Sequence, residues 1–197
     1  KNARRSAGNM ERKFYCGARD QKGLKIRLPS LFEFFQSSPR RPSSSGVLIV
    51  ASGGLGDAVL FSLVLPRLTH LAHDGEQITL LVPASAAKMS FLFGPEVETL
   101  AVDYNRLAKE RPYRREFETK LKDRCFRLVI STDYLRHPKR DELLIKACNA
   151  PECIAMNARP WSKYDRLLDK NRVLYTRLFE SGPPLMDKVI RWTLFAN

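Results

Sequence analysis

The sequence has few residues of the kinds that build zinc sites or disulfide frameworks. Its 197 residues include 4 cysteines and 3 histidines, and no two cysteines form a CxxC pair. No histidine lies near a cysteine at metal-ligand spacing, so we expect no structural zinc and a reducing, cytoplasmic environment. A long hydrophobic run is also lacking: the longest uncharged apolar stretch, residues 58–65, is less than half of the ~20 residues that cross a bilayer. An integral membrane protein is therefore excluded.

The sequence begins without an initiator Met or a signal-peptide pattern, and it stops within a helix-like apolar pattern. We therefore expect a fragment of a longer protein. Basic residues outnumber acidic ones by 34 to 21, and most of the excess lies in residues 1–45. A Ser/Pro/Gly-rich stretch, residues 36–46, ends this region. We expect a basic, partly disordered extension over residues 1–45 and a folded domain over residues 46–197.

The extension contains a short amphipathic segment, residues 24–35, in which leucine, isoleucine and phenylalanine are interleaved with Lys25, Arg27 and Glu33. One interpretation is that it packs on the domain itself or on another part of the protein. A second is contact with a membrane surface, which would place the protein on the cytoplasmic face of the bacterial inner membrane. A third is nucleic-acid binding through phosphate neutralisation, which we do not expect because no nucleic-acid fold pattern accompanies the charge.

From residue 47 onward, short apolar β-branched runs alternate with longer helical stretches. This alternation predicts a Rossmann-like α/β domain, a parallel sheet with helices on both faces. We expect helices at residues 57–72, 84–93, 105–124 and 139–149. The expected strands are residues 47–52, 77–82, 99–102, 127–131, 153–156 and 172–175.

The turn after the first expected strand, in VLIVASGGLGDAVLF, is the most informative stretch. Gly53, Gly54 and Gly56 allow close approach of a ligand and positive φ angles, at the place where open parallel sheets bind ligands. A dinucleotide fits poorly because Val59 stands where the third small residue belongs, and Asp57 would repel a pyrophosphate. We expect no bound cofactor. Asp57 itself has two interpretations, a helix N-cap or an ionised carboxylate that faces the cleft and accepts a proton.

Several segments resemble the amino-terminal half of the family 9 glycosyltransferases, the bacterial ADP-heptose:lipopolysaccharide heptosyltransferases and their relatives. They are VLIVASGGLGDAVLFSLVLPRL, ITLLVPASAA, EVETLAVD, FRLVIS, LLIKACNAPECIAMN and VLYTRLFESGPPLMDKVIRW. The resemblance implies the acceptor-side domain of a two-domain GT-B fold and inverting, metal-independent glycosyl transfer. The general base of this family falls on Asp57. The nucleotide-sugar donor would bind the second domain, which lies outside this sequence.

We expect a glycan or glycolipid acceptor, of lipopolysaccharide type or another, and an acceptor of lipopolysaccharide type is anionic. Four residues after the fourth expected strand are candidate acceptor contacts, together with the three glycines: Asp133, Arg136, Lys139 and Arg140. The three basic residues could equally form a solvated helix face or helix start, and turn capping is the commoner role for an aspartate placed like Asp133. Trp161 is the one aromatic residue that we would test as a sugar-stacking platform. Two other functions stay open, a Rossmann-type nucleotide-binding enzyme and a basic module that binds nucleic acid or membrane.

Overall fold

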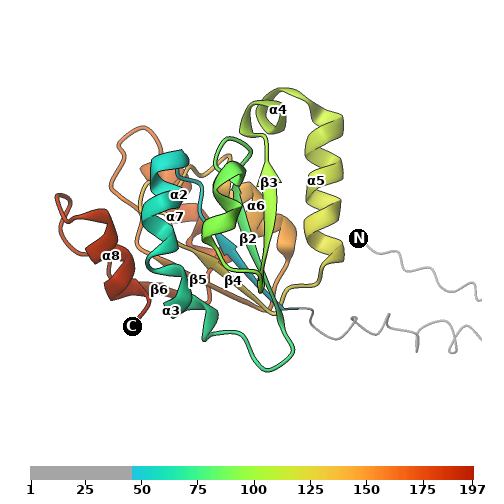
Figure 1. Ribbon diagram of the computed structural model, residues 1–197. Helices are drawn as coiled ribbons and strands as arrows, with labels where there is room; N and C mark the ends of the chain where they lie inside the picture. The colour runs from blue at the N-terminus through green and yellow to red at the C-terminus, as the bar shows by residue number, and fades with distance from the viewer. Residues whose placement is uncertain (1–45) are drawn as a thin grey trace, which may run out of the picture. The chain divides into compact units, whose positions relative to one another are not determined.

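The computed structural model describes residues 46–197, so the expectations for residues 1–45 lie outside the described part of the chain. Residues 46–197 form a six-stranded sheet in the order β3-β2-β1-β4-β5-β6, and every pair of neighbouring strands is parallel (Figure 1). The predicted Rossmann-like sheet is therefore confirmed. Its strands are β1 (Gly46–Val50), β2 (Gln77–Pro83), β3 (Val97–Val102), β4 (Leu128–Ser131), β5 (Glu152–Met156) and β6 (Arg177–Phe179).

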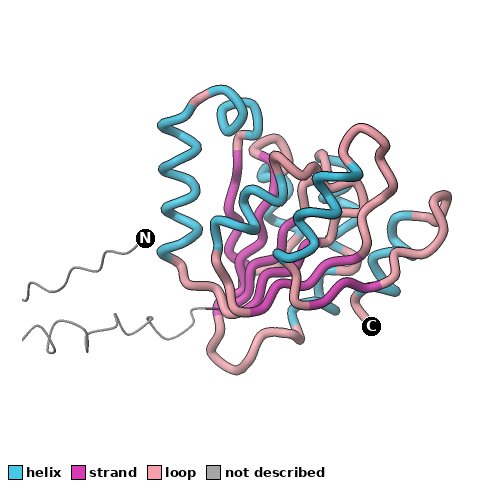
Figure 2. The backbone as a smooth tube through the Cα atoms, turned by 180° about the vertical axis from the view of Figure 1, so that it is seen from behind, coloured by secondary structure: helices cyan, strands magenta, loops and turns pink. Residues whose placement is uncertain are grey.

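Helices cover both faces of the sheet, which lies between them in Figures 1 and 2. Alternate residues of β1 point to opposite faces: Val47 and Ile49 belong to one apolar core, and Leu48 and Val50 to the other. Helices α2 (Leu55–Ser62), α3 (Leu65–Thr69) and α8 (Lys188–Phe195), with the 3₁₀ helix η1 (Ala87–Leu92), lie on the first face. Helices α4 (Tyr104–Lys109), α5 (Arg111–Asp123) and α6 (Asp141–Cys148) lie on the second.

Two of the long helices expected from the sequence are each divided, because proline and an extended residue interrupt them. The stretch expected at residues 57–72 becomes α2 and α3, and Pro66 lies in the first turn of α3. The stretch expected at residues 105–124 becomes α4 and α5, separated by Glu110 in an extended conformation and followed by Pro112 in the first turn of α5. Proline lacks the N–H that a helix interior requires but is accepted in a first turn.

Near the carboxyl end of the sequence, one expected strand is misplaced and one helix was not expected. Residues 172–175 were expected as the sixth strand, but Arg172–Leu174 form the 3₁₀ helix η2, and the strand lies at Arg177–Phe179. The apolar run is misleading because Val173 is exposed and Tyr175 uses its hydroxyl to bond Glu142. Helix α7 (Asp165–Asn171) was not expected, since only Leu168 in it is buried.

Candidate functional site

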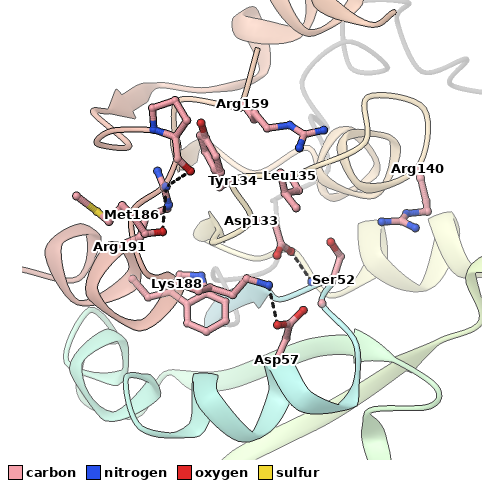
Figure 3. Close-up of a pocket in the computed structure, with 13 residues that line it drawn as sticks. Ser52, Asp57, Asp133, Tyr134, Leu135, Arg140, Arg159, Met186, Lys188 and Arg191 are labelled. Carbon is pink, nitrogen blue, oxygen red and sulfur yellow. Dashed lines mark hydrogen bonds and ion pairs between the residues drawn. The ribbon is translucent and has the colours of Figure 1, made fainter. Parts of the chain in front are cut away.

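The candidate site lies beyond the carboxyl ends of β1 and β4. These strands are neighbours, with Val50 beside Ser131, and the strand order reverses between them. In open parallel sheets this is the point where ligands bind. A cavity of about 410 Å³ opens here (Figure 3). Its lining comes from the loops after β1, β4 and β5, from the first turn of α2 and from the region of α8: Ser52, Gly53, Asp57, Asp133, Tyr134, Leu135, Arg140, Arg159, Pro184, Met186, Lys188, Arg191 and Trp192.

Asp57 lies in the first turn of α2 and faces this cavity (Figure 3). The helix begins at Leu55 with Gly54 as its N-cap, and no side chain caps it, so the N-cap interpretation of Asp57 is wrong. The carboxylate instead accepts a hydrogen bond from Lys188 Nζ at 2.6 Å, and its side chain is 30% exposed. An accessible carboxylate is thus held beside a cation at the edge of the cavity.

Lys188 reaches Asp57 because α8 is fixed against the sheet. The Trp192 indole N–H donates to the backbone oxygen of Thr132 at 2.9 Å, and the Trp192 ring packs edge-on to Phe61 with 5.1 Å between ring centroids. Asp187 caps α8 by accepting from two backbone N–H groups of its first turn. These contacts place the first residue of α8 over the first turn of α2.

The three glycines of the turn have different surroundings, and none of them has a positive φ angle, contrary to expectation. A Cβ on Gly53 would lie 2.5 Å from both Cβ and Oδ2 of Asp57, so the close packing of Asp57 requires glycine there. Around Gly54 and Gly56, a Cβ would meet no atom within 4 Å. These two glycines are exposed and do not line the cavity, whereas Gly53 does.

Asp133 lines the same cavity, and its carboxylate accepts the backbone N–H of Ser52. This hydrogen bond joins residues 81 positions apart. Burial raises the pKa of Asp133 to about 6, a rise that the bond to Ser52 opposes and nearby Asp141 reinforces. The charge of Asp133 therefore changes just below neutral pH.

The three predicted basic contacts after β4 have separate environments. Arg140 lines the cavity, bonds Asp141 and stacks on the Tyr104 ring. Lys139 is exposed and is not among the residues that line the cavity. Arg136 is 3% exposed. Its guanidinium lies 2.9 Å from Glu142 and also donates to the Met156 carbonyl. This geometry favours a structural role for Arg136 over a ligand contact.

Sequence reasoning missed several cations of the cavity. Lys188 and Arg191 come from α8, more than 130 residues after Asp57, and Arg159 follows β5. Arg191 stacks on the Tyr134 ring at 3.8 Å and donates to four backbone carbonyls of the loop before α8. The Gly-Pro-Pro sequence before Asp187 was the available signal for a loop at this edge. Trp161 is not among the residues that line this cavity and packs edge-on against His137 and Tyr164.

Residues 46–197 contain neither a metal-binding cluster nor a membrane-spanning helix. No group of three or more His, Cys, Asp or Glu side chains in this part of the chain could hold a metal ion. Within the same residues, every helix is too short or too polar to cross a bilayer. The cysteines that the structure describes, Cys125, Cys148 and Cys153, are free thiols.

Comparison with solved structures gives a likeness of fold. The chain is similar to the E. coli heptosyltransferase WaaC with ADP, with a TM-score of 0.55 and 18% sequence identity over 76% of this chain. It is also similar to E. coli heptosyltransferase WaaC with ADP-2-deoxy-2-fluoro heptose, with a TM-score of 0.53 and 17% identity. The chain covers 46% of each WaaC chain. No protein-family model and no curated protein sequence matches it. The fold is thus that of part of a GT-B heptosyltransferase.

The burial of Arg136 beside Glu142 predicts how a substitution there changes the free energy of unfolding. Arg136→Met would leave Glu142 buried without its cation, and breaking such a pair typically costs about 3–5 kcal/mol. Urea denaturation should show a loss of this size, whereas Lys139→Met, at an exposed position, should change the unfolding free energy by less than about 0.5 kcal/mol. Equal effects of the two substitutions would contradict a structural role for Arg136.

The two glycines Gly53 and Gly56 should respond to alanine with opposite signs. Gly53→Ala places a methyl group against Asp57, and such overpacking costs roughly 1–3 kcal/mol. Gly56→Ala adds a methyl group in open space within a helix, which should stabilise by about 0.5–1 kcal/mol. Thermal and urea denaturation of both variants check this, and a neutral Gly53→Ala would show that Asp57 does not pack as described.

Proposed function

We propose that this chain supplies the acceptor side of an inverting, metal-independent glycosyltransferase of the heptosyltransferase type, with Asp57 as its general base. The observation that supports this most is the position of Asp57, an accessible carboxylate at the switch point of the sheet, beside a cavity and next to a cation. The likeness of fold to WaaC supports the same class of reaction. Because the chain spans about half of WaaC, the activity, the donor and the acceptor all belong to the proposal.

The reaction requires one base on the acceptor side. An acceptor hydroxyl oxygen forms a bond to the anomeric carbon of the donor sugar while the bond from that carbon to the donor's diphosphate oxygen breaks on the opposite face. The hydroxyl proton passes to the carboxylate of Asp57, and the nucleoside diphosphate leaves with the bonding electrons. Lys188 Nζ lies 2.6 Å from Asp57 Oδ1, so the incoming hydroxyl must share this carboxylate with the lysine.

The charges around the cavity suit a polar, anionic acceptor. Besides Lys188, the cations Arg140 and Arg159 line it and lie on separate loops (Figure 3). Arg159 has no acidic partner among the described residues. Guanidinium groups bind carboxylates and phosphates through paired hydrogen bonds. We therefore infer a glycan or glycolipid acceptor that carries acidic groups, of lipopolysaccharide type. The free thiols are consistent with a cytoplasmic enzyme, and contact with the inner membrane belongs to the same proposal.

A Rossmann-type nucleotide-binding enzyme is the second candidate. The strand order is that of dinucleotide-binding domains, and the space around Gly54 and Gly56 is open. Lys188 also offsets part of the repulsion that Asp57 would exert on a pyrophosphate. Calorimetric titration of the full-length protein with NAD and with ADP-heptose separates the candidates. Binding of NAD that Gly54→Val abolishes would favour this second function, and binding of ADP-heptose without NAD binding would favour the first.

The test of the base is a transfer assay on the full-length protein with ADP-heptose and a heptose-free lipopolysaccharide core. Asp57→Asn should lower kcat by about 10²- to 10⁴-fold and change KM little, because it removes the proton acceptor but keeps the shape. Asp123→Asn, at an exposed aspartate in the last turn of α5, is the matched control and should keep full activity.

A decrease of less than about threefold for Asp57→Asn would contradict the general-base role. The same assay tests the other parts of the proposal. Transfer should continue in the presence of EDTA, and the product should have the anomeric configuration opposite to that of the donor. Retention of configuration, or loss of activity in EDTA that added Mg²⁺ restores, would overturn the inverting or the metal-independent part.

A further inference from the structure

The loops that follow β1 and β4 are joined by an acidic side chain. Val50 and Ser131 are partners in the parallel pair, so Ser52 and Asp133, each two residues further on, come side by side. Thr132 donates both its backbone N–H and its hydroxyl to the Val50 carbonyl. The Asp133 carboxylate then accepts from Ser52 N–H, in the place where a backbone carbonyl would continue the ladder (Figure 3).

This hydrogen bond lies one residue from the packing contact of Asp57. Ser52 precedes Gly53, and a Cβ on Gly53 would lie only 2.5 Å from Asp57. The position of the Gly53 backbone therefore determines where the Asp57 carboxylate can lie. Loss of the hydrogen bond to Ser52 N–H would therefore affect Asp57, because Ser52 is covalently bonded to Gly53 and Gly53 packs against Asp57.

We propose that Asp133 is a positioning residue: by accepting the Ser52 N–H bond it holds the loop that places Asp57 in the cavity. This inference goes beyond the proposed function, which assigns no role to Asp133, and it rests on that function only because it takes Asp57 as the residue to be placed. The hydrogen bond from Ser52 N–H to Asp133 does not need a substrate, so the positioning role can be measured without a transfer assay.

The strength of the bond should depend on pH. The charged groups that face Asp133 are Asp141 at the start of α6, Arg140 beside it and Lys188 of α8, and the Tyr104 hydroxyl of α4 is also close. Burial is the largest influence and raises the pKa of Asp133 to about 6 from the ordinary value of 3.8. Above pH 6 the ionised carboxylate is a strong acceptor for the N–H, and below pH 6 the protonated group is a weaker one.

The sign of the stability effect follows from the same shift. Between about pH 4 and pH 6 the folded protein holds a proton on Asp133 that the unfolded chain has released. The contribution of Asp133 to the free energy of unfolding therefore decreases as pH rises through that interval. Asp133→Asn removes this pH dependence because the amide does not titrate, and its side-chain oxygen still accepts from Ser52.

The experiment is NMR of the isotopically labelled 197-residue chain between pH 5 and pH 8. The Ser52 amide resonance should titrate with a midpoint near the pKa of about 6 in the wild type and lose this titration in Asp133→Asn. Asp165→Asn is the matched control because Asp165 also accepts a backbone N–H, that of Trp161, away from the cavity. The control should keep the wild-type titration of Ser52.

A second substitution separates positioning from titration. In Asp133→Ala, hydrogen exchange of the Ser52 amide should become at least about tenfold faster, and the Asp57 carboxyl carbon resonance should move. A Ser52 amide that does not titrate near pH 6, or Asp57 signals that are unchanged in Asp133→Ala, would overturn the proposal. If Asp133→Ala does not fold, the pH titration of the Ser52 amide in the wild type and in Asp133→Asn decides whether the proposal holds. These experiments measure no sugar transfer. A negative result would therefore contradict the positioning role of Asp133, and the general-base role of Asp57 would still be tested by the transfer assay.

Discussion

The parallel pairing of β1 with β4 is the constraint on which the whole candidate site depends. It brings the loop that leads to Asp57 beside the loop that carries Asp133, although the two lie far apart in the sequence. It also creates the reversal of strand order that opens a crevice at this edge. Burial stabilises this pairing, since every residue of β1 and β4 is buried beneath the helices that cover the two faces of the sheet.

The ion pair between Asp57 and Lys188 orients the Asp57 carboxylate and contributes little to the stability of the fold. Both side chains are partly exposed, 30% and 42%, and pairs of this kind contribute about 0–1 kcal/mol. Helix α8 is fixed by other contacts, above all those of Trp192 and Arg191. The cation can therefore move relative to Asp57 without unfolding the helix. A partner of this kind orients the Asp57 carboxylate and still leaves room for a hydroxyl.

Much of the fold could be predicted from the sequence, because each central strand is covered on both faces and is apolar throughout. The β1 run of residues 46–50, with every residue buried, is an example. The sixth strand was misplaced because an edge strand buries little, so the exposed Val173 run was the stronger apolar signal. The divisions of the long helices depended on backbone geometry at Glu110 and near Pro66, which apolar periodicity does not report.

The site was predictable only where its residues are neighbours in sequence. Gly53 and Asp57 belong to one turn, and the turn's position after a buried strand indicated them. Lys188 and Arg191 were missed because only tertiary packing brings α8 to α2. Arg136 was a candidate because it follows β4, but its partner Glu142, six residues on and fully buried, gives it a structural environment that charge counting does not indicate.

The most direct test of the central claim is a crystal structure of the full-length protein with an acceptor glycan and an unreactive donor analogue. The account predicts that an acceptor hydroxyl lies about 2.6–3.2 Å from the Asp57 carboxylate, on the side facing the anomeric carbon of the donor. An acceptor bound away from this cavity, or a donor phosphate in contact with Asp57, would contradict it.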